Sequence, residues 1–300
     1  MNASPAGGPR VSAAATLPGG RCRSASGGAA GTVVADLRFA RGGGRTFLAW
    51  QSVPYPFHIT RPHYLDLALP DLATLYMQSA SGGLYRGDRL SLSIGAGPGA
   101  RAHITSQAAT VVHTATGSGV QVDTQIDVAR GAVLALTTDP YILFPGTELS
   151  VTTEVSLASG AVAILAEGFS VHDPVARERP FTRLATACRI RDEAGRILLD
   201  ERSRLEGTAF LGAASPLGCY RAMGTLLLLG QAVTALDPAH LEASLDGTGV
   251  LAGCSPLPNA AGWGVRLLAR DGGHLRRGTE TAYTLGFEAL VGARPERRRK

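Results

Sequence analysis

The stretch VQVDTQIDVARGAVLALTT, residues 120–138, decides the fold, because two similar stretches flank it at 88–106 and 148–167. They read DRLSLSIGAGPGARAHITS and ELSVTTEVSLASGAVAILAE. In each, one strand pattern leads to a Gly-Ala pair and a more apolar strand pattern follows. The pairs begin at Gly99, Gly131 and Gly160. The unit therefore recurs after 32 and then 29 residues, and such regular spacing is typical of stacked supersecondary units.

The two strands of a unit differ in their hydrophobic pattern. The first alternates, with Val122, Ile126 and Val128 on one face, which is typical of a half-buried strand. The second is apolar on both faces and is expected to be fully buried. Layered sheets or a helical winding of strands would satisfy both patterns, whereas an α/β sheet needs crossover helices where this chain has only glycine turns. The sequence predicts a mainly β fold of layered or helically wound sheets, built from repeated strand-turn-strand units.

The glycines at 95, 97 and 99 invite a different interpretation, because a strand followed by such a run begins a dinucleotide-binding loop. That loop must lead into a helix whose N-terminus holds the phosphate. The residues that follow include Ile104, Thr105 and 110–112, which are β-branched and favour a strand. We therefore interpret the run as a turn between two strands.

The C-terminal third carries one hairpin pattern and two helix patterns. Residues 182–205 contain two alternating arms joined by an Asp-Glu-Ala-Gly turn, which indicates a hairpin. Asp237 as N-cap, Pro238 at the first helical position and Gly247 as a stop predict a helix. A second helix is predicted within 274–292, where apolar residues recur near helical spacing. About two α-helices are therefore expected in this third.

Composition divides the chain into a folded body and two tails. Residues 1–30 are rich in Gly, Ala, Ser and Pro and have no apolar run of the length of a signal peptide, so a disordered extension is expected. Residues 31–291 are expected to form a single β-rich domain, and residues 292–300 a basic, solvated tail. No stretch approaches the ~20 apolar residues of a membrane span, so no membrane partner is expected.

The net charge of +5 resides in the tails, because residues 1–30 contribute +3 and residues 294–300 contribute +4, which leaves −2 on the body. A nucleic-acid-binding face needs basic residues clustered on the folded body, so no nucleic-acid partner is expected. The four cysteines are Cys22, Cys188, Cys219 and Cys254. Their wide separation fits neither a disulfide framework nor a metal knuckle, and a cytoplasmic location is the simplest expectation.

The sequence carries no local catalytic motif. Its seven histidines are scattered, and no serine lies in a G-x-S-x-G elbow. An enzyme is therefore not expected, although residues far apart in sequence could still converge in space.

Three acidic residues, Asp88, Glu167 and Glu201, are more informative than any motif. Glu167 has apolar neighbours on both sides, and a carboxylate is costly to bury there unless it is paired, hydrated or bound to a cation. Asp88 follows the glycine-rich SGGLYRG, and Glu201 ends an apolar run. Each also has a structural interpretation: Asp88 as a turn cap, Glu201 as the partner of Arg202 or Arg204, and Glu167 as the partner of an arginine from the next strand.

Several segments resemble one known family in their order and spacing. They are LRFARGGGRTFLAWQ (37–51), GGLYRGDRLSLSIGAGPGARAHITSQAATVVH (82–113), DPYILFPG (139–146) and LLDERSRLEG (198–207). From about Gly31 to Val291 the chain is similar to the UreD family of urease accessory proteins, also called UreH. It departs from many relatives at Val111, where they carry a lysine, and at His113-Thr114, where they carry a Tyr-Arg pair.

The resemblance implies a non-catalytic, β-rich urease maturation factor that works in nickel delivery. Its expected partners are the urease apoenzyme, UreF and, through UreF, the GTPase UreG. Nickel would pass through an interior polar channel, with no tightly bound cofactor. By motif, Asp88, Glu167 and Glu201 would face that channel. Oxygen ligands of this kind bind a divalent ion loosely, whereas a His or Cys cage would trap it.

The alternative function is a β-rich enzyme or a carbohydrate-binding module, for which stacked strands would be an equally good scaffold. A sugar-binding module is expected to present a concave aromatic groove. Only two tryptophans, Trp50 and Trp263, are available in the sequence, and aromatic residues make up 6% of it, which counts against this alternative.

Overall fold

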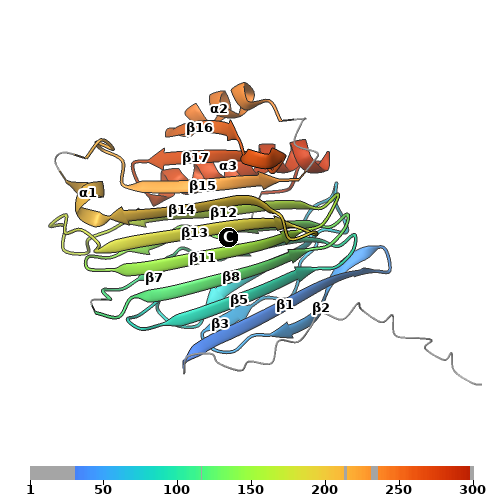
Figure 1. The fold of residues 1–300 in the computed structure, drawn as a ribbon, viewed down its shortest axis with the longest axis horizontal. Coiled ribbons are helices and arrows are strands. Elements are labelled where there is room, and N and C mark those ends of the chain that lie inside the picture. The colour runs from blue at the N-terminus through green and yellow to red at the C-terminus, as the bar shows by residue number, and fades with distance from the viewer. Residues whose placement is uncertain (1–30, 116, 213–214, 231–235, 298–300) are drawn as a thin grey trace, which may run out of the picture. The chain divides into compact units, whose positions relative to one another are not determined.

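The computed structural model (Figure 1) describes residues 31–115, 117–212, 215–230 and 236–297. The disordered extension expected at residues 1–30 and the last three residues of the expected basic tail lie outside these described residues. Between residues 31 and 297 the chain forms two β-sheets that stack on a shared apolar interior. None of the described helices combines the length and the hydrophobicity that a membrane span requires.

The first sheet has seven strands. In spatial order they are β14 (Ile197–Glu206), β13 (Arg183–Asp192), β11 (Glu148–Leu157), β8 (Val120–Val128), β5 (Arg89–Ala96), β1 (Thr32–Gly42) and β2 (Arg45–Ser52). The five strands from β13 to β1 pair in parallel, while the β13–β14 and β1–β2 pairs are antiparallel.

The second sheet has ten strands. Its main path runs β16 (Val250–Pro256), β17 (Gly262–Ala269), β15 (Ala222–Leu229), β12 (Val162–Val171), β9 (Val133–Thr137), β6 (Arg101–Ser106), β4 (Ala73–Ser79) and β3 (Phe57–Ile59). Two short strands lie off this path, β10 (Tyr141–Leu143), which pairs with β12, and β7 (Thr110–Val112), which pairs with β10.

The repeat predicted from the sequence is the winding unit of this fold. In each unit the first strand lies in the seven-stranded sheet and the second in the ten-stranded sheet, so the chain crosses between sheets at every Gly-Ala pair. Equivalent strands of successive units then pair in parallel, as β5–β8–β11 and as β6–β9–β12. Layered sheets and a helical winding of strands, the two architectures that the pattern left open, are the same structure here, because the winding itself produces the two layers.

The three turn glycines explain why the crossing is so tight. Gly99, Gly131 and Gly160 have φ of 65°, 67° and 71°, a left-handed conformation that costs glycine little. The run that resembled a nucleotide-binding loop is therefore a turn between β5 and β6, as we interpreted it.

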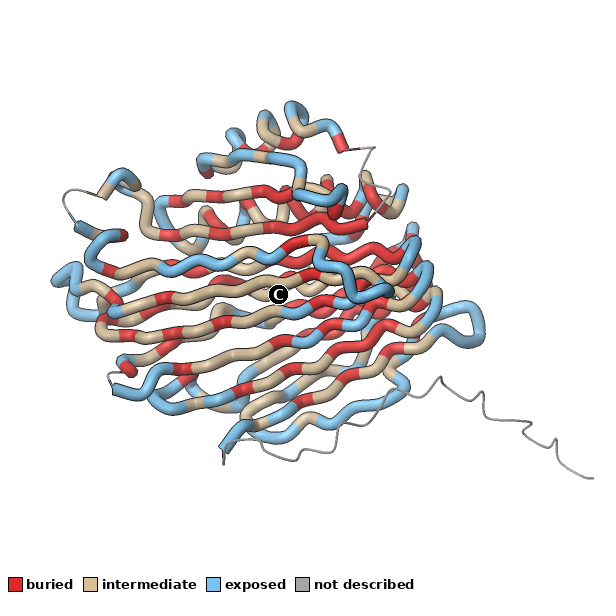
Figure 2. The backbone as a smooth tube through the Cα atoms, viewed as in Figure 1, coloured by how far each residue is buried: buried red, intermediate tan, exposed pale blue. Residues whose placement is uncertain are grey.

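The burial pattern follows from the layers. Along the strands of the seven-stranded sheet, buried residues alternate with intermediate and exposed ones (Figure 2), because one face is open to solvent. The central strands of the ten-stranded sheet are buried on both faces, since helices cover the outer one. This difference is the physical reason for the two hydrophobic patterns within each repeat unit.

Both predicted helices form. Asp237 caps α2 (Pro238–Asp246) and Asp271 caps α3 (Gly272–Val291), each by accepting hydrogen bonds from backbone N–H groups. The side chains of Leu275, Ala282 and Phe287 on α3 pack onto the ten-stranded sheet. The sequence did not predict the short helix α1 (Gly207–Leu211) or the 3₁₀ turn η2 (Pro258–Ala260). The predicted hairpin is β13 and β14.

The described part of the C-terminal tail lies against the body. Pro295 is buried, and the backbone N–H of Glu296 donates to Oδ1 of the buried Asp66. Burial raises the pKa of the Asp66 carboxyl. Ala293 packs against the apolar cluster beneath α3, while Arg294, Glu296 and Arg297 of the expected basic tail are exposed.

Candidate functional site

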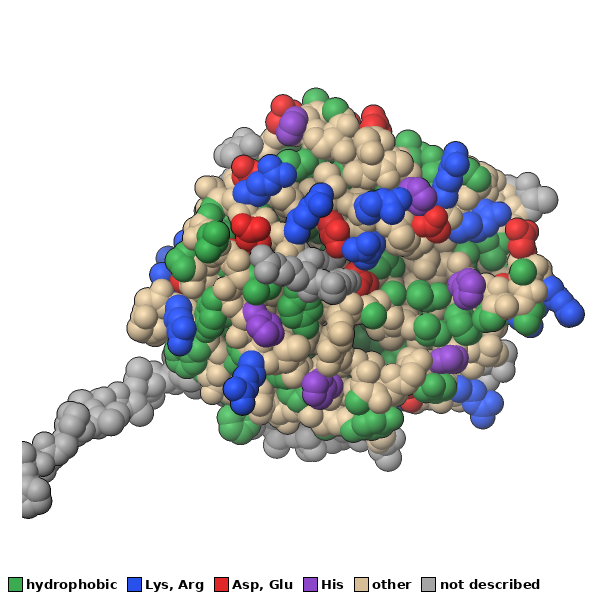
Figure 3. Space-filling view, turned by 180° about the vertical axis from the view of Figure 1, so that it is seen from behind, with side chains coloured by type: hydrophobic (Ala, Val, Ile, Leu, Met, Phe, Trp, Pro, Cys, Tyr) green, Lys and Arg blue, Asp and Glu red, His purple; other side chains and the backbone are tan. Residues whose placement is uncertain are grey.

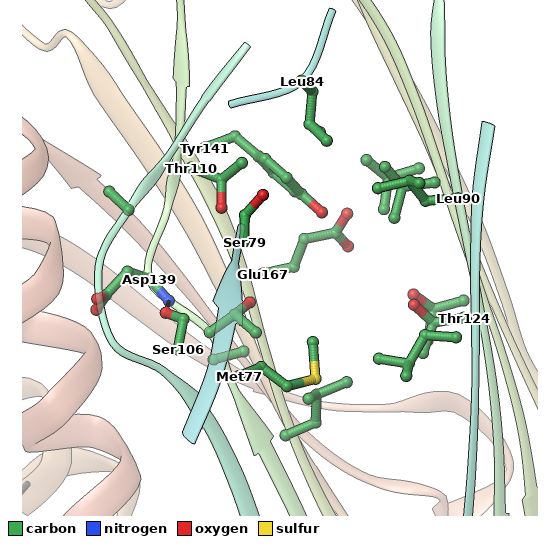
Figure 4. Close-up of a pocket in the computed structure, with 18 of the residues that line it drawn as sticks. Met77, Ser79, Leu84, Leu90, Ser106, Thr110, Thr124, Asp139, Tyr141 and Glu167 are labelled. Carbon is green, nitrogen blue, oxygen red and sulfur yellow. Dashed lines mark hydrogen bonds between the residues drawn. The ribbon is translucent and has the colours of Figure 1, made fainter. Parts of the chain in front are cut away.

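A cavity of about 430 Å³ lies between the two sheets. Apolar clusters border it on both sides, one around Ile94, Ile126 and Leu165 and the other around Val151 and Phe169. Figure 4 shows Leu90 and Thr124 reaching into it from one side, and Glu167 with Tyr141 from the other. The cavity thus interrupts what would otherwise be a continuous apolar interior.

Polar side chains line the cavity at one level of the strands, and we call them the polar belt. It consists of Thr124, Thr153, Cys188 and Glu201 from the seven-stranded sheet and Glu167, Thr225 and Arg266 from the ten-stranded sheet. Within each sheet these residues are direct neighbours across successive strands. On β11 the inward positions one step to either side, Val151 and Val155, are apolar.

Glu167 is the most constrained residue of the polar belt. Its Oε1 is inaccessible to solvent and has no hydrogen-bond partner among the described residues. Burial raises the pKa of Glu167 to about 7; the carboxylate of Glu201 adds to the rise and the guanidinium of Arg266 opposes it. The Tyr141 hydroxyl points toward Glu167 (Figure 4). Burial and the charge of Glu167 raise the pKa of that hydroxyl, so Tyr141 keeps its proton.

Glu201 lies across the interior from Glu167 and is paired. Nη2 of Arg266 donates to Oε1 of Glu201 at 2.5 Å, and Nη1 donates to Oγ1 of Thr225 at 2.6 Å. The ion pair joins β14 to β17 and therefore bridges the two sheets. Beside it, burial and Glu167 raise the pKa of the Cys188 thiol to about 12, so the thiol keeps its proton at neutral pH.

Asp88 lies elsewhere. It is absent from the cavity lining, and its Oδ2 accepts a hydrogen bond from the backbone N–H of Tyr85 at 2.8 Å. This is the turn-capping role that was its structural alternative. Of the three predicted acidic residues, the fold therefore brings Glu167 and Glu201 together and leaves Asp88 apart. Across the described residues, no three His, Cys, Asp or Glu side chains gather closely enough to form a metal cage.

Sequence reasoning missed most of the polar belt. Thr124 and Thr153 occupy the same place in two repeat units, and each replaces an apolar residue in the inward-facing alternation of its strand. A polar residue at an inward position of an otherwise alternating strand is a signal that the sequence alone contains. Arg266 gave no such signal, because its contact with Glu201 joins residues 65 positions apart in different sheets.

A second cavity of about 750 Å³ adjoins the first. The two share residues 107–109, Val111 and Asp139, and the second reaches the first turn of α3. At the surface near by, the His113 ring stacks on Tyr85 with centroids 4.5 Å apart. His113 is thus held by ring packing. Neither tryptophan is among the described residues that line either cavity, so the aromatic groove of a sugar-binding module is not formed there.

The outer surface mixes the two signs of charge. On the face opposite to that of Figure 1, basic and acidic side chains are interspersed (Figure 3). Several arginines are held by ion pairs, among them Arg179 with Asp173 and Arg189 with Asp200. The Asp173 carboxylate accepts five hydrogen bonds from its own loop, and these, led by the Arg179 side chain, hold its pKa well below the usual range.

The fold and the site define a class of protein, a wound, two-sheet β-protein that encloses a cavity crossed by a belt of polar side chains. Residues 31–300 match the family described as UreD urease accessory protein. The chain belongs to this family.

Three relatives illustrate the similarity. A urease accessory protein UreD 1 of Methylorubrum populi is 52% identical over 269 residues, covering 89% of this chain and 92% of that protein. A UreD 1 of a Bradyrhizobium species is 44% identical over 268 residues, covering 89% and 95%. A UreD 1 of Pseudomonas syringae pv. syringae is 32% identical over 261 residues, covering 86% and 91%.

Proposed function

We propose that the chain is a urease maturation factor that binds the urease apoenzyme and UreF, recruits UreG through UreF, and passes nickel through the polar cavity between its sheets. It acts as a scaffold and conduit without catalysing a reaction. Membership of the UreD family supports the role in maturation. The observation that carries the nickel path is the carboxylate of Glu167, which faces the cavity with one buried oxygen unpartnered.

The chemistry of the polar belt suits a cation in transit. Carboxylate and hydroxyl oxygens are hard ligands, which a divalent ion can exchange quickly when they are few. Glu167 and Glu201 would contact the ion, while Thr124 and Thr153 supply hydroxyls that replace part of its water shell.

The three described cysteines, Cys188, Cys219 and Cys254, are free thiols. Free thiols favour a reducing compartment, so we place the proposed function in the cytoplasm.

The test is urease activation in cells that express the cognate urease operon, with this chain intact, deleted or substituted. Glu167→Gln removes the buried charge at nearly constant shape, and Glu154→Gln is the matched control, because Glu154 is exposed beside Thr153 on β11. Activation should be lost on deletion and fall at least tenfold in the Glu167 variant, while the control retains it. A pull-down of urease and UreF follows each variant.

The outcomes separate the parts of the proposal. Active urease after deletion would overturn the role in maturation and return the β-rich enzyme to consideration. Full activation by the Glu167 variant would leave the scaffold but refute this nickel path. Loss of activation together with loss of both partners would make Glu167 structural.

A further inference from the structure

Arg266 is the only cation among the described residues that line the cavity between the sheets. The acids of that lining are Asp139, Glu167 and Glu201, and the Asp139 carboxylate points away from Glu167 (Figure 4). The balance of charge around the polar belt therefore depends on one guanidinium. The nickel path as proposed assigns no role to it.

We propose that Arg266 is a displaceable internal counter-ion, which holds Glu201 when the cavity is empty and gives it up to a divalent cation. The guanidinium thereby competes with the cation and keeps its binding loose. This inference rests on the proposed function, because it concerns the same cavity.

The position of the ion pair permits displacement. The side chains of Arg266 and Glu201 are 41% and 34% exposed, so solvent reaches the pair. Partly exposed pairs contribute little to stability and are screened, so a divalent ion can replace the guanidinium. Arginine can turn its charged end into water while its aliphatic stem stays packed. Glu167, with its buried oxygen, has no such freedom.

The charge count gives the counter-ion its effect. With Arg266 in place, Glu167 and Glu201 together with the guanidinium carry at most one net negative charge. Without it, two carboxylates would face the cation uncompensated in a partly desolvated site, where a unit charge a few ångströms away changes binding strongly. A site of that kind would retain the ion, whereas a conduit has to release it.

The alternative is that the pair only ties the sheets together. It joins strands of different sheets, so its loss could loosen the sandwich and leave cation binding unchanged or weaker. Loss of Arg266 should tighten cation binding if it is a counter-ion, and should leave binding unchanged or weaker if it only joins the sheets. Variants can therefore separate the two roles.

The experiment titrates Ni²⁺ alone into the full chain at pH 7.5 by calorimetry, with thermal unfolding as a check on folding. Arg266→Met keeps the packing of the stem and removes the charge, and we expect Ni²⁺ to bind about tenfold tighter or more. Glu201→Gln should weaken binding about tenfold, because a carboxylate is lost. The double variant restores one net negative charge, and its affinity should return to within about threefold of the parent.

Each remaining outcome decides the question. Unchanged or weaker binding in Arg266→Met would overturn the counter-ion, as would a double variant that binds as tightly as Arg266→Met. If the parent shows no measurable binding, Arg266→Met should bring it into range, and failure to do so refutes the inference. If Arg266→Met does not fold, Glu201→Gln decides, since unchanged affinity there contradicts competition for Glu201.

Failure of the inference and failure of the proposed function are distinguishable in the cell. Should both Glu167→Gln and Glu201→Gln support normal urease activation, the cavity is not the nickel path and both fall. Should Glu167→Gln abolish activation while Arg266→Met leaves Ni²⁺ affinity unchanged, the nickel path survives and only the counter-ion fails.

Discussion

Two levels of the same sandwich differ in what they bury. At the level of Ile126 and Val155, facing strands enclose a cluster of apolar side chains. One step along the same strands, at Thr124 and Thr153, the polar belt surrounds a cavity with an unpartnered carboxylate, that of Glu167. The apolar level therefore stabilises the winding, while the polar belt gives up some of that stabilisation and keeps an open interior.

The largest effect should come from the apolar level. Ile126 is fully buried, and Ile126→Ala would leave a cavity that rigid parallel strands cannot close. We expect a loss of about 2–5 kcal/mol in the free energy of unfolding, measured by urea denaturation. A loss below about 1 kcal/mol would show that the two levels do not differ as described.

Substitution of Glu167 should raise the free energy of unfolding, whereas substitution of Ile126 should lower it. Because the pKa of Glu167 is about 7 in the folded chain against a usual 4.5, folding is most favourable with respect to this group below pH 4.5. That contribution is lost as the pH rises through about 7. Glu167→Gln should therefore be more stable than the parent at pH 8, by at most about 3 kcal/mol, with the difference vanishing toward pH 4.5. Denaturation at several pH values checks this, and a difference independent of pH would contradict it.

Asp88 is a useful contrast to Glu167, because its carboxylate has a hydrogen-bond partner and the buried oxygen of Glu167 has none. Asp88→Ala removes the acceptor of the Tyr85 N–H and should destabilise the chain by about 1 kcal/mol. Asp88→Asn retains an acceptor oxygen and should stay near the parent in both stability and urease activation. A loss of activation by the asparagine variant, with stability intact, would return Asp88 to the nickel path.

The smallest expected difference in stability is between two substitutions on β11, each of which exchanges a methyl group and a hydroxyl group. Val155→Thr places a hydroxyl in the apolar level and should cost about 1–2 kcal/mol. Thr153→Val, two residues earlier, removes a hydroxyl from the cavity wall and should change stability by less than about 0.5 kcal/mol. Equal costs at the two positions, measured by thermal unfolding, would erase the distinction between the levels.

Most elements of the fold were predictable from local sequence patterns. The alternation in β8, the glycine turns at 131 and 160 and the Asp237–Pro238 cap of α2 each specify their element through neighbours in sequence. The helix α1 lacked such a signal, since it has five residues and its N-cap side chain makes no capping hydrogen bond. The roles of the acidic residues were harder to predict, because they depend on neighbours in space that lie far away in the sequence.

By itself, then, the sequence determined a mainly β fold wound from strand-turn-strand units, two C-terminal helices and a short set of acids in unusual surroundings. Only the tertiary structure decided that Glu167 and Glu201 share a cavity, that Asp88 caps a turn and that Arg266 pairs with Glu201. The physical reason is register. Contacts across parallel strands and between stacked sheets join residues far apart in the chain, and a slip of one residue would turn each side chain to the opposite face.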